Sequence, residues 1–366
     1  MLELEKFLEY EQPTKYIVND DNYDDSYEIP VLTAGQSFIL GYTNEQDNVF
    51  PIEKLPVLIF DDFTTSVQYV DFPFKVKSSA MKILHPTEKA NIKYFYYLLK
   101  SIKVNNSTHK RYWISEYSKF KVKFKSLSEQ QDIVERLETI TKAIDNRKKM
   151  IDDCHFYLHS IFNSMFGNLV SNDKKYSIKT LNEVADISSS KRIYAKEYVS
   201  CGVPFYRSTE IIELSSGKKP KSELYISLER YNEIKEKYGV PKIGDILITA
   251  VGTIGKTWIV KDDAPFYYKD GNLILIHLRE KISQVYFKYA LDILIENFKK
   301  RNVNGTSYFA LTIEKFKGMD FVLPPFELQV KFENIVQHIN FQIAQYQKDI
   351  DDLEQLLQIK MNEYFS

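Results

Sequence analysis

The chain has 366 residues, of which 44% are hydrophobic and 27% charged, and this length is sufficient for two domains with separate cores. No run of 18 or more apolar residues is present and the acidic N-terminus lacks an apolar segment, so we expect neither a membrane span nor a signal peptide. The two cysteines cannot form a disulfide framework, and no cysteine and histidine spacing is that of a zinc site. These features favour a cytoplasmic protein.

The distribution of charge is more informative than the formal net charge of -1. Residues 1–62 contain 14 acidic and 3 basic side chains, a net charge of -11, whereas residues 63–126 contain 3 acidic and 13 basic side chains, a net charge of +10. Because phosphate contacts depend on local basic surface, the balanced total does not exclude DNA as a partner. We interpret the acidic block as a surface that faces away from phosphates, toward a partner subunit.

The first half predicts a strand, a short helix and a long helix. Residues 56–60 (PVLIF) are typical of a buried strand, and residues 92–101 (IKYFYYLLKS) of a short aromatic helix. From residue 133, mostly apolar residues recur at alternating spacings of four and three residues for about five heptads, which is typical of a coiled-coil seam. Gly167 is placed to end this helix. The predicted seam residues are Ile133, Leu137, Ile140, Ile144, Ile151 and Leu158.

A polar linker at residues 168–175 precedes a second set of the same elements. Residues 245–249 (DILIT) predict a strand and residues 284–293 (QVYFKYALDI) a short aromatic helix. A second long helix follows the prolines at 324 and 325 and keeps the four-three spacing. Each long helix, of about 38 residues, would be roughly 57 Å long. The second set of predicted seam residues is Phe332, Val336, Ile339, Ile343, Ile350 and Leu357.

An internal repeat relates the two halves. With a shift of 199 residues, 105–167 align with 304–366 without a gap, and Gln130 falls on Gln329. With a shift of 192, residues 80–85 align with 272–277 and His85 falls on His277. Two equal seams, each ending its own half, are expected to pack on one another. We therefore predict an α+β fold, with two pseudo-twofold-related mixed α/β modules joined by a long antiparallel two-helix coiled coil.

Three features resemble catalytic or ligand sites, but each has a simpler interpretation. Residues 250–257 (AVGTIGKT) lack the first glycine of a phosphate-binding loop, so we expect a hairpin turn with Gly252, Gly255 and an exposed Lys256 at its tip. Residues 323–326 (LPPF) lack the amide or carboxylate that amino-group methylation needs, and we expect a proline stop before the second long helix. His85 and His277 have no second ligand at metal spacing and are expected to be structural. We predict no catalytic residue, metal site or cofactor.

Basic and hydroxyl residues interleaved with aromatic residues are the positive signal. Lysine, serine and threonine bind phosphates, whereas arginine, asparagine and lysine can also bond to base edges in the major groove. Their recurrence in both halves favours double-stranded DNA as a partner. The predicted DNA-binding residues are Lys75, Lys77, Ser78, Ser79, His109, Lys110 and Arg111 in the first half, and Lys191, Arg192, Arg207, Ser208, Thr209, Lys218, Lys219, Lys256, Asn304, Thr306 and Ser307 in the second.

The duplicated architecture suggests how such residues would be used. Two similar modules held apart by a stiff helix pair can contact two short DNA segments separated by a fixed gap, as twofold dimers contact half-sites. Because the modules differ in sequence, the half-sites should differ too. The alternative is a coiled-coil scaffold that binds only protein, which salt-dependent binding to duplex DNA would distinguish. A nucleotide-dependent enzyme built on residues 250–257 is a third hypothesis, and it predicts ATP binding by the chain.

The chain resembles the DNA-specificity subunits of type I restriction-modification systems over nearly its whole length. The resemblance rests on the duplication, on LPPFELQ at residues 323–329 and on the Gly-x-x-Gly-Lys turn at residues 252–256. The helix endings IFNSMF at residues 161–166 and KMNEYF at residues 360–365 fit as well. The first half departs from the pattern, since FKSLSEQ at residues 124–130 lacks both prolines and FDDFTTS at residues 60–66 replaces the glycine turn.

The resemblance implies that each module is a target recognition domain that reads one half of a split, asymmetric site. It also implies that the helices set the spacing and bind two methyltransferase subunits, that restriction/translocase subunits join later, and that the chain itself has no catalysis. The predicted domains are a first target recognition domain at residues 1–126, a first spacer helix at 127–167, a linker at 168–178, a second target recognition domain at 179–324 and a second spacer helix at 325–366.

Overall fold

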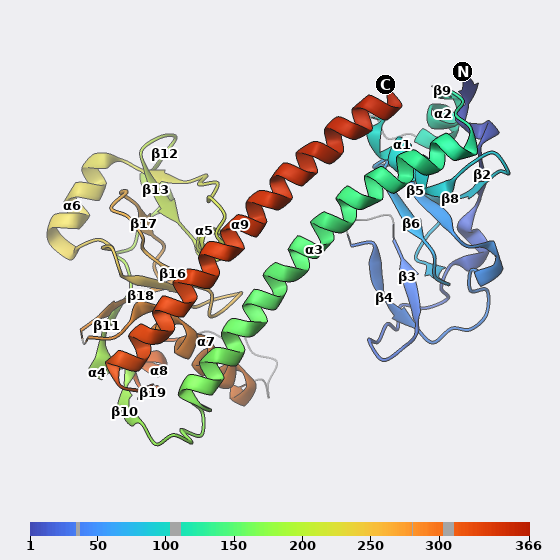
Figure 1. Cartoon of the computed structure of the whole chain (residues 1–366). Helices are drawn as coiled ribbons and strands as arrows, with labels where there is room; N and C mark the ends of the chain where they lie inside the picture. The colour runs from blue at the N-terminus through green and yellow to red at the C-terminus, as the bar shows by residue number, and fades with distance from the viewer. Residues whose placement is uncertain (34–36, 103–110, 280, 303–310) are drawn as a thin grey trace. The chain divides into compact units, whose positions relative to one another are not determined.

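A computed structural model of the chain describes residues 1–33, 37–102, 111–279, 281–302 and 311–366 (Figure 1). Its contacts define two compact units. The first unit comprises Met1–Ile151 and Gln345–Ser366, and the second comprises Asp152–Ala344. Each unit therefore contains one α+β module together with a stretch of both long helices.

The module of the first unit contains a four-stranded and a three-stranded sheet. The four strands lie in the order β2–β8–β5–β6 and are antiparallel, whereas the order β4–β3–β7 includes the parallel pair β3 and β7. Helix α1 lies against β5 and β6. The elements are β1 (Leu2–Glu3), β2 (Leu8–Glu11), β3 (Ile29–Leu32), β4 (Ile39–Thr43), β5 (Val57–Asp61), β6 (Val67–Val70), β7 (Lys75–Val76), β8 (Met81–Pro86), α1 (Ile92–Ser101), α2 (Tyr112–Ser115) and β9 (Lys121–Val122).

The module of the second unit repeats this arrangement. Its antiparallel sheet has the order β11–β18–β15–β16, and a further sheet of order β12–β14–β13–β17 includes the parallel pair β13 and β17. The elements are β10 (Ser177–Thr180), α4 (Leu181–Val184), β11 (Ala185–Ser188), β12 (Tyr198–Val199), β13 (Val203–Tyr206), α5 (Ser208–Ser215), β14 (Tyr225–Ile226), α6 (Leu228–Tyr238), β15 (Ile246–Thr249), β16 (Thr257–Ile259), β17 (Tyr267–Tyr268), β18 (Leu273–Leu278), α7 (Gln284–Asn302), α8 (Ile313–Lys317) and β19 (Asp320–Leu323).

The central strands explain the continuous apolar runs in the sequence. In β5, Leu58 and Phe60 point into the cluster beneath α1, whereas Val57 and Ile59 point into a second cluster on the other face. In β15, Leu247 likewise belongs to a different cluster from its neighbours. A strand covered on both faces needs apolar residues at every position, so the period of two disappears from its sequence.

The long helices are α3 (Leu127–Phe166) and α9 (Phe326–Phe365), of 40 residues each. Gly167 follows α3 with a φ of +72°, a conformation that glycine adopts without strain, and two prolines directly precede α9. All twelve predicted seam residues are buried or half-buried. In the second unit the end of α3 packs on the start of α9, with the Phe162 and Phe332 ring centroids 5.2 Å apart, so the two helices run antiparallel there.

The same antiparallel packing occurs in the first unit. Leu137 of α3 shares an apolar cluster with Met361 of α9. Arg147 occupies a seam position, where its Nε lies 2.8 Å from Asp349 Oδ2 and its guanidinium lies 6.0 Å from the centre of the Tyr346 ring. The Arg147 charge thus lies between the two helices, directly beside the Asp349 carboxylate with which it pairs.

Each long helix is anchored to its module by a buried glutamine. Gln130 Oε1 accepts a hydrogen bond from Asn91 N (2.8 Å), and Gln329 Oε1 accepts one from Ser283 N (3.0 Å). The side-chain nitrogens donate to the carbonyl oxygens five residues earlier, at 2.9 and 2.8 Å. The glutamine that the two halves share therefore ties the start of the aromatic helix to the start of the long helix.

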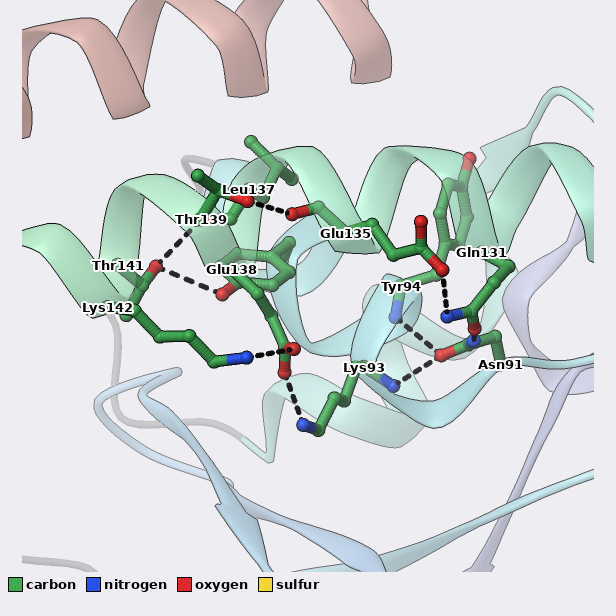
Figure 2. Close-up of polar contacts among 11 residues, drawn as sticks. Asn91, Lys93, Tyr94, Gln131, Glu135, Leu137, Glu138, Thr139, Thr141 and Lys142 are labelled. Carbon is green, nitrogen blue, oxygen red and sulfur yellow. Dashed lines mark hydrogen bonds and ion pairs between the residues drawn. The ribbon is translucent and has the colours of Figure 1, made fainter.

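Figure 2 shows that further polar contacts join α1 to α3 in the first unit. Lys93 forms an ion pair with Glu138, and this hydrogen bond lowers the pKa of the Glu138 carboxyl. Asn91 Nδ2 donates to Gln131 Oε1 at 2.8 Å. Helix α3 thus begins as part of the module core, which fixes its direction relative to that module.

The second aromatic helix is longer than predicted, because α7 continues from the expected end at residue 293 to Asn302. Leu291 and Ile295 are buried and Phe298 is half-buried, so the apolar face continues for another two turns. The charged residues in between mask this pattern in the sequence.

Candidate nucleic-acid interface

In the second module, candidate residues gather at the carboxyl ends of the parallel strands β13 and β17. Arg207, Ser208 and Thr209 directly follow β13, and Lys269 follows β17. Lys269 N donates to Tyr206 O at 2.9 Å, which keeps the two chain segments together beyond the last strand residues. Thr209 is exposed, whereas the Ser208 hydroxyl is buried and forms no hydrogen bond with the described residues. This edge of the sheet therefore presents basic side chains together with the hydroxyl of Thr209.

A third segment reaches the end of β17. Lys191 N donates to the hydroxyl of Tyr267 at 2.7 Å, and Arg192 Nε lies 2.7 Å from Asp270 Oδ2. The hydrogen bond from Arg192 to Asp270 raises the pKa of the guanidinium. Lys191 and Arg192 are both exposed, and the ammonium of Lys191 lies 5.3 Å from the centre of the Tyr238 ring. The fold thus brings five predicted residues from two segments to one edge.

Arg207 is held by a buried acid. Its Nη2 lies 2.9 Å from Glu210 Oε1, and Glu210 is 1% exposed. Burial raises the pKa of Glu210, but the hydrogen bonds from the side chain and backbone of Arg207 outweigh it, so the pKa is lowered. The hydrogen bond to Glu210 raises the pKa of Arg207. This pair fixes the guanidinium at the start of α5.

The hairpin of β15 and β16 confirms the predicted turn. Gly252 and Gly255 have φ values of +72° and +90°, and the hydroxyl of Thr249 accepts from Lys256 N at 2.9 Å. A strand follows Lys256, so these residues do not form the loop-and-helix cradle that nucleotide phosphates need. Lys256 is exposed and, together with Ser215, lines a cavity of about 240 Å³.

Lys218 and Lys219 lie just beyond the end of α5 and are exposed. Within the described residues, neither of them forms an ion pair, and the same holds for Lys256 and Lys191. These four lysines keep their charge available to a phosphate, whereas Arg192 and Arg207 share theirs with carboxylates.

The first module uses the equivalent edge. Lys77, Ser78 and Ser79 follow β7, the parallel partner of β3, and Lys77 N donates to Leu32 O at 2.8 Å. The side chain of Lys77 forms an ion pair with Asp21, and this hydrogen bond raises the pKa of the lysine. Both modules therefore place predicted residues at the carboxyl end of the same strand pair.

Lys75 does not fit the prediction. Its side chain is 1% exposed, and its ammonium lies 2.8 Å from Glu45 Oε2 and 2.7 Å from Asp47 O. The sequence KVK predicts two exposed lysines on one face of a strand, but β7 is covered on the side of Lys75. The buried ammonium of Lys75 is therefore not available for contact with DNA.

The acidic and basic blocks of the sequence are partly paired within the first unit. Among the described residues, three lysine–carboxylate ion pairs join them, namely Glu45–Lys75, Asp21–Lys77 and Asp62–Lys82. The charge of the acidic block is thus used in part to neutralise basic residues of the same module, while much of the remainder, like the paired Asp21, faces solvent. Asp20, Asp24 and Asp25 belong to that exposed remainder.

Arg111 is exposed and occupies the N-cap position of α2. No ion pair of Arg111 is found within the part of the chain that the structure describes. The other predicted residues of these two segments, His109, Lys110, Asn304, Thr306 and Ser307, lie outside the described residues.

Lys269 is absent from the predicted set although it is equivalent to Lys77. Lys77 N bonds to the last residue of β3, and Lys269 N bonds to the last residue of β13. The shift of 192 residues that aligns the flanking strands also places Lys77 on Lys269, so the repeat itself contains the signal.

The remaining candidate sites are structural. His85 Nε2 lies 3.1 Å from Glu11 Oε2, and His277 Nδ1 lies 2.7 Å from Asp245 Oδ1, so each histidine bonds to one carboxylate. Among the described residues, no group of three or more histidine, cysteine, aspartate or glutamate side chains is arranged to hold a metal ion. In the same residues, no helix combines the length and apolar character of a membrane span.

These features define a class of two-module chain in which each module presents basic and hydroxyl side chains at one end of a parallel strand pair and is followed by a long helix. The family model for the type I restriction modification DNA specificity domain matches residues 2–153 and 173–360. Because this match covers most of the sequence, the chain belongs to that family.

Individual relatives agree with this assignment. The type I restriction enzyme EcoR124I/EcoR124II specificity subunit of Escherichia coli is 48% identical over 151 residues, which are 38% of this chain and 37% of that protein. The putative type I restriction enzyme specificity subunit S.HindORF215P of Haemophilus influenzae (strain ATCC 51907 / DSM 11121 / KW20 / Rd) is 26% identical over 254 residues, 66% of this chain and 62% of that protein. The matches thus span 37% and 62% of the length of these relatives.

The fold is shared with a solved structure. The S subunit of the type I restriction-modification system from M. genitalium is similar with a TM-score of 0.54 and 16% sequence identity, over 100% of this chain and 95% of that one. The duplicated α+β fold predicted from the sequence is therefore confirmed.

Proposed function

We propose that this chain is the DNA sequence-recognition subunit of a type I restriction-modification complex, in which each module reads one half of a bipartite, asymmetric site. The observation that carries the proposal is the equivalent edge of the two modules. Both place basic and hydroxyl side chains at the carboxyl ends of a parallel strand pair, but the residues differ. Lys77, Ser78 and Ser79 follow β7 in one module, whereas Arg207, Ser208 and Thr209 follow β13, the counterpart of β3, in the other. The same edge with different side chains in the two modules suits two different half-sites.

The long helices are proposed to set the gap between the half-sites and to bind two methyltransferase subunits. Large apolar side chains are exposed on them outside the seam, and exposed apolar surface marks binding sites for other proteins. Phe156 is 76% exposed and Phe341 66%. The full set of such residues is Leu127, Met150, Phe156, Tyr157, Phe341, Leu356 and Ile359.

In this proposal the chain contributes recognition and assembly, and no catalytic step. The methyltransferase subunits and the restriction/translocase subunits that join them carry out the chemistry, in the cytoplasm, on double-stranded DNA. The chain belongs to the DNA specificity family, and this favours DNA reading over the alternative of a scaffold that binds only protein.

The proposal is tested by mapping methylated bases in cells that express the methyltransferase subunits with or without this chain. We expect methylation at a motif of two short, different half-sites separated by a fixed number of unspecified bases, and only when the chain is present. A single uninterrupted motif, or a pattern that is the same without the chain, would contradict the proposal.

A further inference from the structure

Asp62 of the first module and Ala250 of the second occupy equivalent positions at the ends of β5 and β15. Asp62 O accepts a hydrogen bond from Tyr112 N at 3.0 Å, and Ala250 O accepts one from Leu311 N at 2.9 Å. On the other side, Asp62 N and Ala250 N donate to the carbonyl oxygens of the residues before β8 and β18, at 3.3 and 2.8 Å. The backbone hydrogen bonds of this residue are therefore the same in the two modules, whereas its side chain differs.

The side chain at this position matters for the helix whose start bonds to it, which is α2 in the first module and α8 in the second. In the second module, α8 is capped by its own N-cap residue, since the Thr312 hydroxyl accepts from Lys315 N at 3.3 Å. In the first module, α2 starts after Arg111, whose side chain makes no capping hydrogen bond. Instead, Asp62 Oδ1 accepts from Trp113 N at 2.8 Å. A carboxylate from a distant strand thus satisfies the amide that an N-cap side chain ordinarily satisfies.

The carboxylate of Asp62 is buried and has a buried partner. Asp62 is 1% exposed, Lys82 is 0% exposed, and Lys82 Nζ lies 3.2 Å from Asp62 Oδ2. The ammonium is not aligned for a hydrogen bond with any described residue, so its role is that of a counter-charge. In the second module Ile274 stands at the position of Lys82, because β5 pairs Phe60 with Lys82 and β15 pairs Ile248 with Ile274.

The two modules therefore offer two solutions for one core position, a buried ion pair and an Ala–Ile pair. A buried ion pair is weak evidence for stability, because desolvation offsets the attraction and an apolar pair of suitable volume is often equally stable. The second module shows that this fold accepts the apolar pair. What the ion pair adds in the first module is an acceptor for Trp113 N.

This acceptor fixes the backbone that directly follows Arg111. Tyr112 and Trp113 are 0% and 1% exposed, and the Trp113 ring meets Phe60 edge-on at 5.3 Å between centroids. Arg111 precedes this buried pair directly and points its charge to solvent. An arginine whose backbone is held in this way can present its guanidinium fork to the two acceptors of a guanine edge. The shift of 199 residues places an alanine, Ala310, at this position of the second half, so the arginine is specific to the first module.

We propose that Asp62 is a positioning residue for DNA recognition: by capping α2, with Lys82 as its buried counter-charge, it holds Arg111 in place for contact with the half-site that the first module reads. The inference rests on the proposed function of the chain. It assigns to Asp62 no contact with DNA.

The test uses the assembled methyltransferase complex with three variants of this chain. The double variant Asp62→Ala/Lys82→Ile installs the pair of the second module and removes the acceptor. The double variant Asp62→Asn/Lys82→Met removes both charges but keeps an oxygen for Trp113 N. The variant Arg111→Ala removes the proposed contact itself. Methylation rates are measured on duplexes with single substitutions in one half-site at a time, and thermal unfolding reports on the fold.

We expect both Arg111→Ala and Asp62→Ala/Lys82→Ile to lower the methylation rate on the wild-type site on the order of tenfold. Both should also lower, on the order of tenfold, the discrimination against a substitution at one base pair of the first half-site, and this base pair should be the same for the two variants. Discrimination at the second half-site should be unchanged in both. Asp62→Asn/Lys82→Met should remain within about twofold of wild type, since one good hydrogen-bond acceptor is retained. A merely structural role of Asp62 would not produce the same half-site pattern as Arg111→Ala.

Wild-type discrimination by a folded Asp62→Ala/Lys82→Ile chain would overturn the inference, and so would loss of first half-site reading in Asp62→Asn/Lys82→Met. If the Asp62→Ala/Lys82→Ile chain fails to assemble, the Asp62→Asn/Lys82→Met chain alone tests the inference. Failure of this second chain is the result expected if the ion pair itself, rather than the acceptor for Trp113 N, is needed. Failure of both to assemble also contradicts the inference, which holds that the fold accepts an uncharged pair. Arg111→Ala distinguishes a failure of the proposed function from a failure of this inference. An unchanged half-site pattern in Arg111→Ala contradicts the role of Arg111 in the proposed function. An effect of Arg111→Ala without an effect of the Asp62 variants contradicts only the role of Asp62.

Discussion

Lys77 and Lys269 hold equivalent positions, but their surroundings differ. Lys77 is paired with Asp21, whereas Lys269 has no ion pair within the described residues. If both contact phosphates, Lys269 releases counterions fully on binding and Lys77 exchanges one anion for another. The slope of log affinity against log salt is negative. We predict that Lys269→Ala reduces its magnitude by about 0.9, and that Lys77→Ala reduces it by less.

The measurement is duplex DNA binding by the assembled complex at several salt concentrations. The control is Lys315→Ala, an exposed lysine on α8 that does not lie at the carboxyl ends of β13 and β17. A slope that is unchanged in Lys269→Ala, or changed equally in Lys315→Ala, would contradict a phosphate contact at this edge.

Glu210 predicts a pH dependence of stability in the second module. Its pKa is lowered in the folded chain by the hydrogen bonds from Arg207, so its contribution is present above the unfolded pKa of about 4.3 and is lost as the pH falls through the lower folded value. We expect Glu210→Gln to lower the free energy of unfolding by about 1.5–3 kcal/mol at pH 7. Urea unfolding at pH 7 and near pH 3 checks this. A difference from wild type that stays constant over this range would contradict it.

Residue identity alone did not predict burial. Lys75 and Lys77 stand two apart, and their sequence pattern is that of one exposed strand face. The structure instead buries Lys75 against Glu45, an acid 30 residues earlier in the chain. Such a partner is set by the pairing of β3 with β4 and β7, which no local pattern encodes.

At the scale of elements, the turn of β15 and β16 offers a test of why it contains two glycines. A side chain at Gly252 would meet nothing within 4 Å, whereas a Cβ at Gly255 would lie 2.5 Å from Ile295 Cγ2 on α7. Both have positive φ values, so both alanine variants carry a backbone cost of about 1–2 kcal/mol. We predict that Gly255→Ala loses roughly 1–3 kcal/mol more than Gly252→Ala. Urea unfolding of the two variants measures the difference, and equal losses would show that α7 does not restrict the turn.

The elements that the sequence predicted well are those with a local signal. The four-three spacing marked both long helices, and the apolar runs marked β5 and β15. The parallel pairs β3–β7 and β13–β17 were not predicted, because β7 and β17 contain two residues each and their partners lie about 40–60 residues earlier. Since the candidate interface is built on these pairs, its residues could be proposed from composition, but their common edge could not.

For the whole molecule, the long helices are proposed to act as a ruler. Inserting one heptad into α3 and one into α9 keeps the seam in register and adds about 10 Å to each helix. We predict that the gap between the two half-sites grows by roughly three base pairs, at 3.4 Å per base pair. Methylome mapping with this variant gives the gap directly. A heptad in only one helix is the control, because it breaks the register of the seam and should prevent assembly. An unchanged gap in the double insertion would rule against a spacer role.

The predicted domain boundaries remain a proposal at this scale. The contacts of the chain divide it inside both long helices rather than at their ends. A module and the helix stretches beside it therefore form one folded unit, which argues that an exchange of modules should keep the buried glutamine contacts of Gln130 or Gln329 intact.

The most direct test of the central claim is an exchange of residues 179–324 for the corresponding module of another chain of this family, followed by mapping of the methylated sequence in cells. Gln329 lies outside the exchanged segment and Ser283 bonds to it through the backbone, so the anchor to α9 can be retained. We predict a motif in which one half-site changes while the other half-site and the gap stay as in wild type. A motif in which both half-sites change, or neither does, would contradict the account that each module reads its own half.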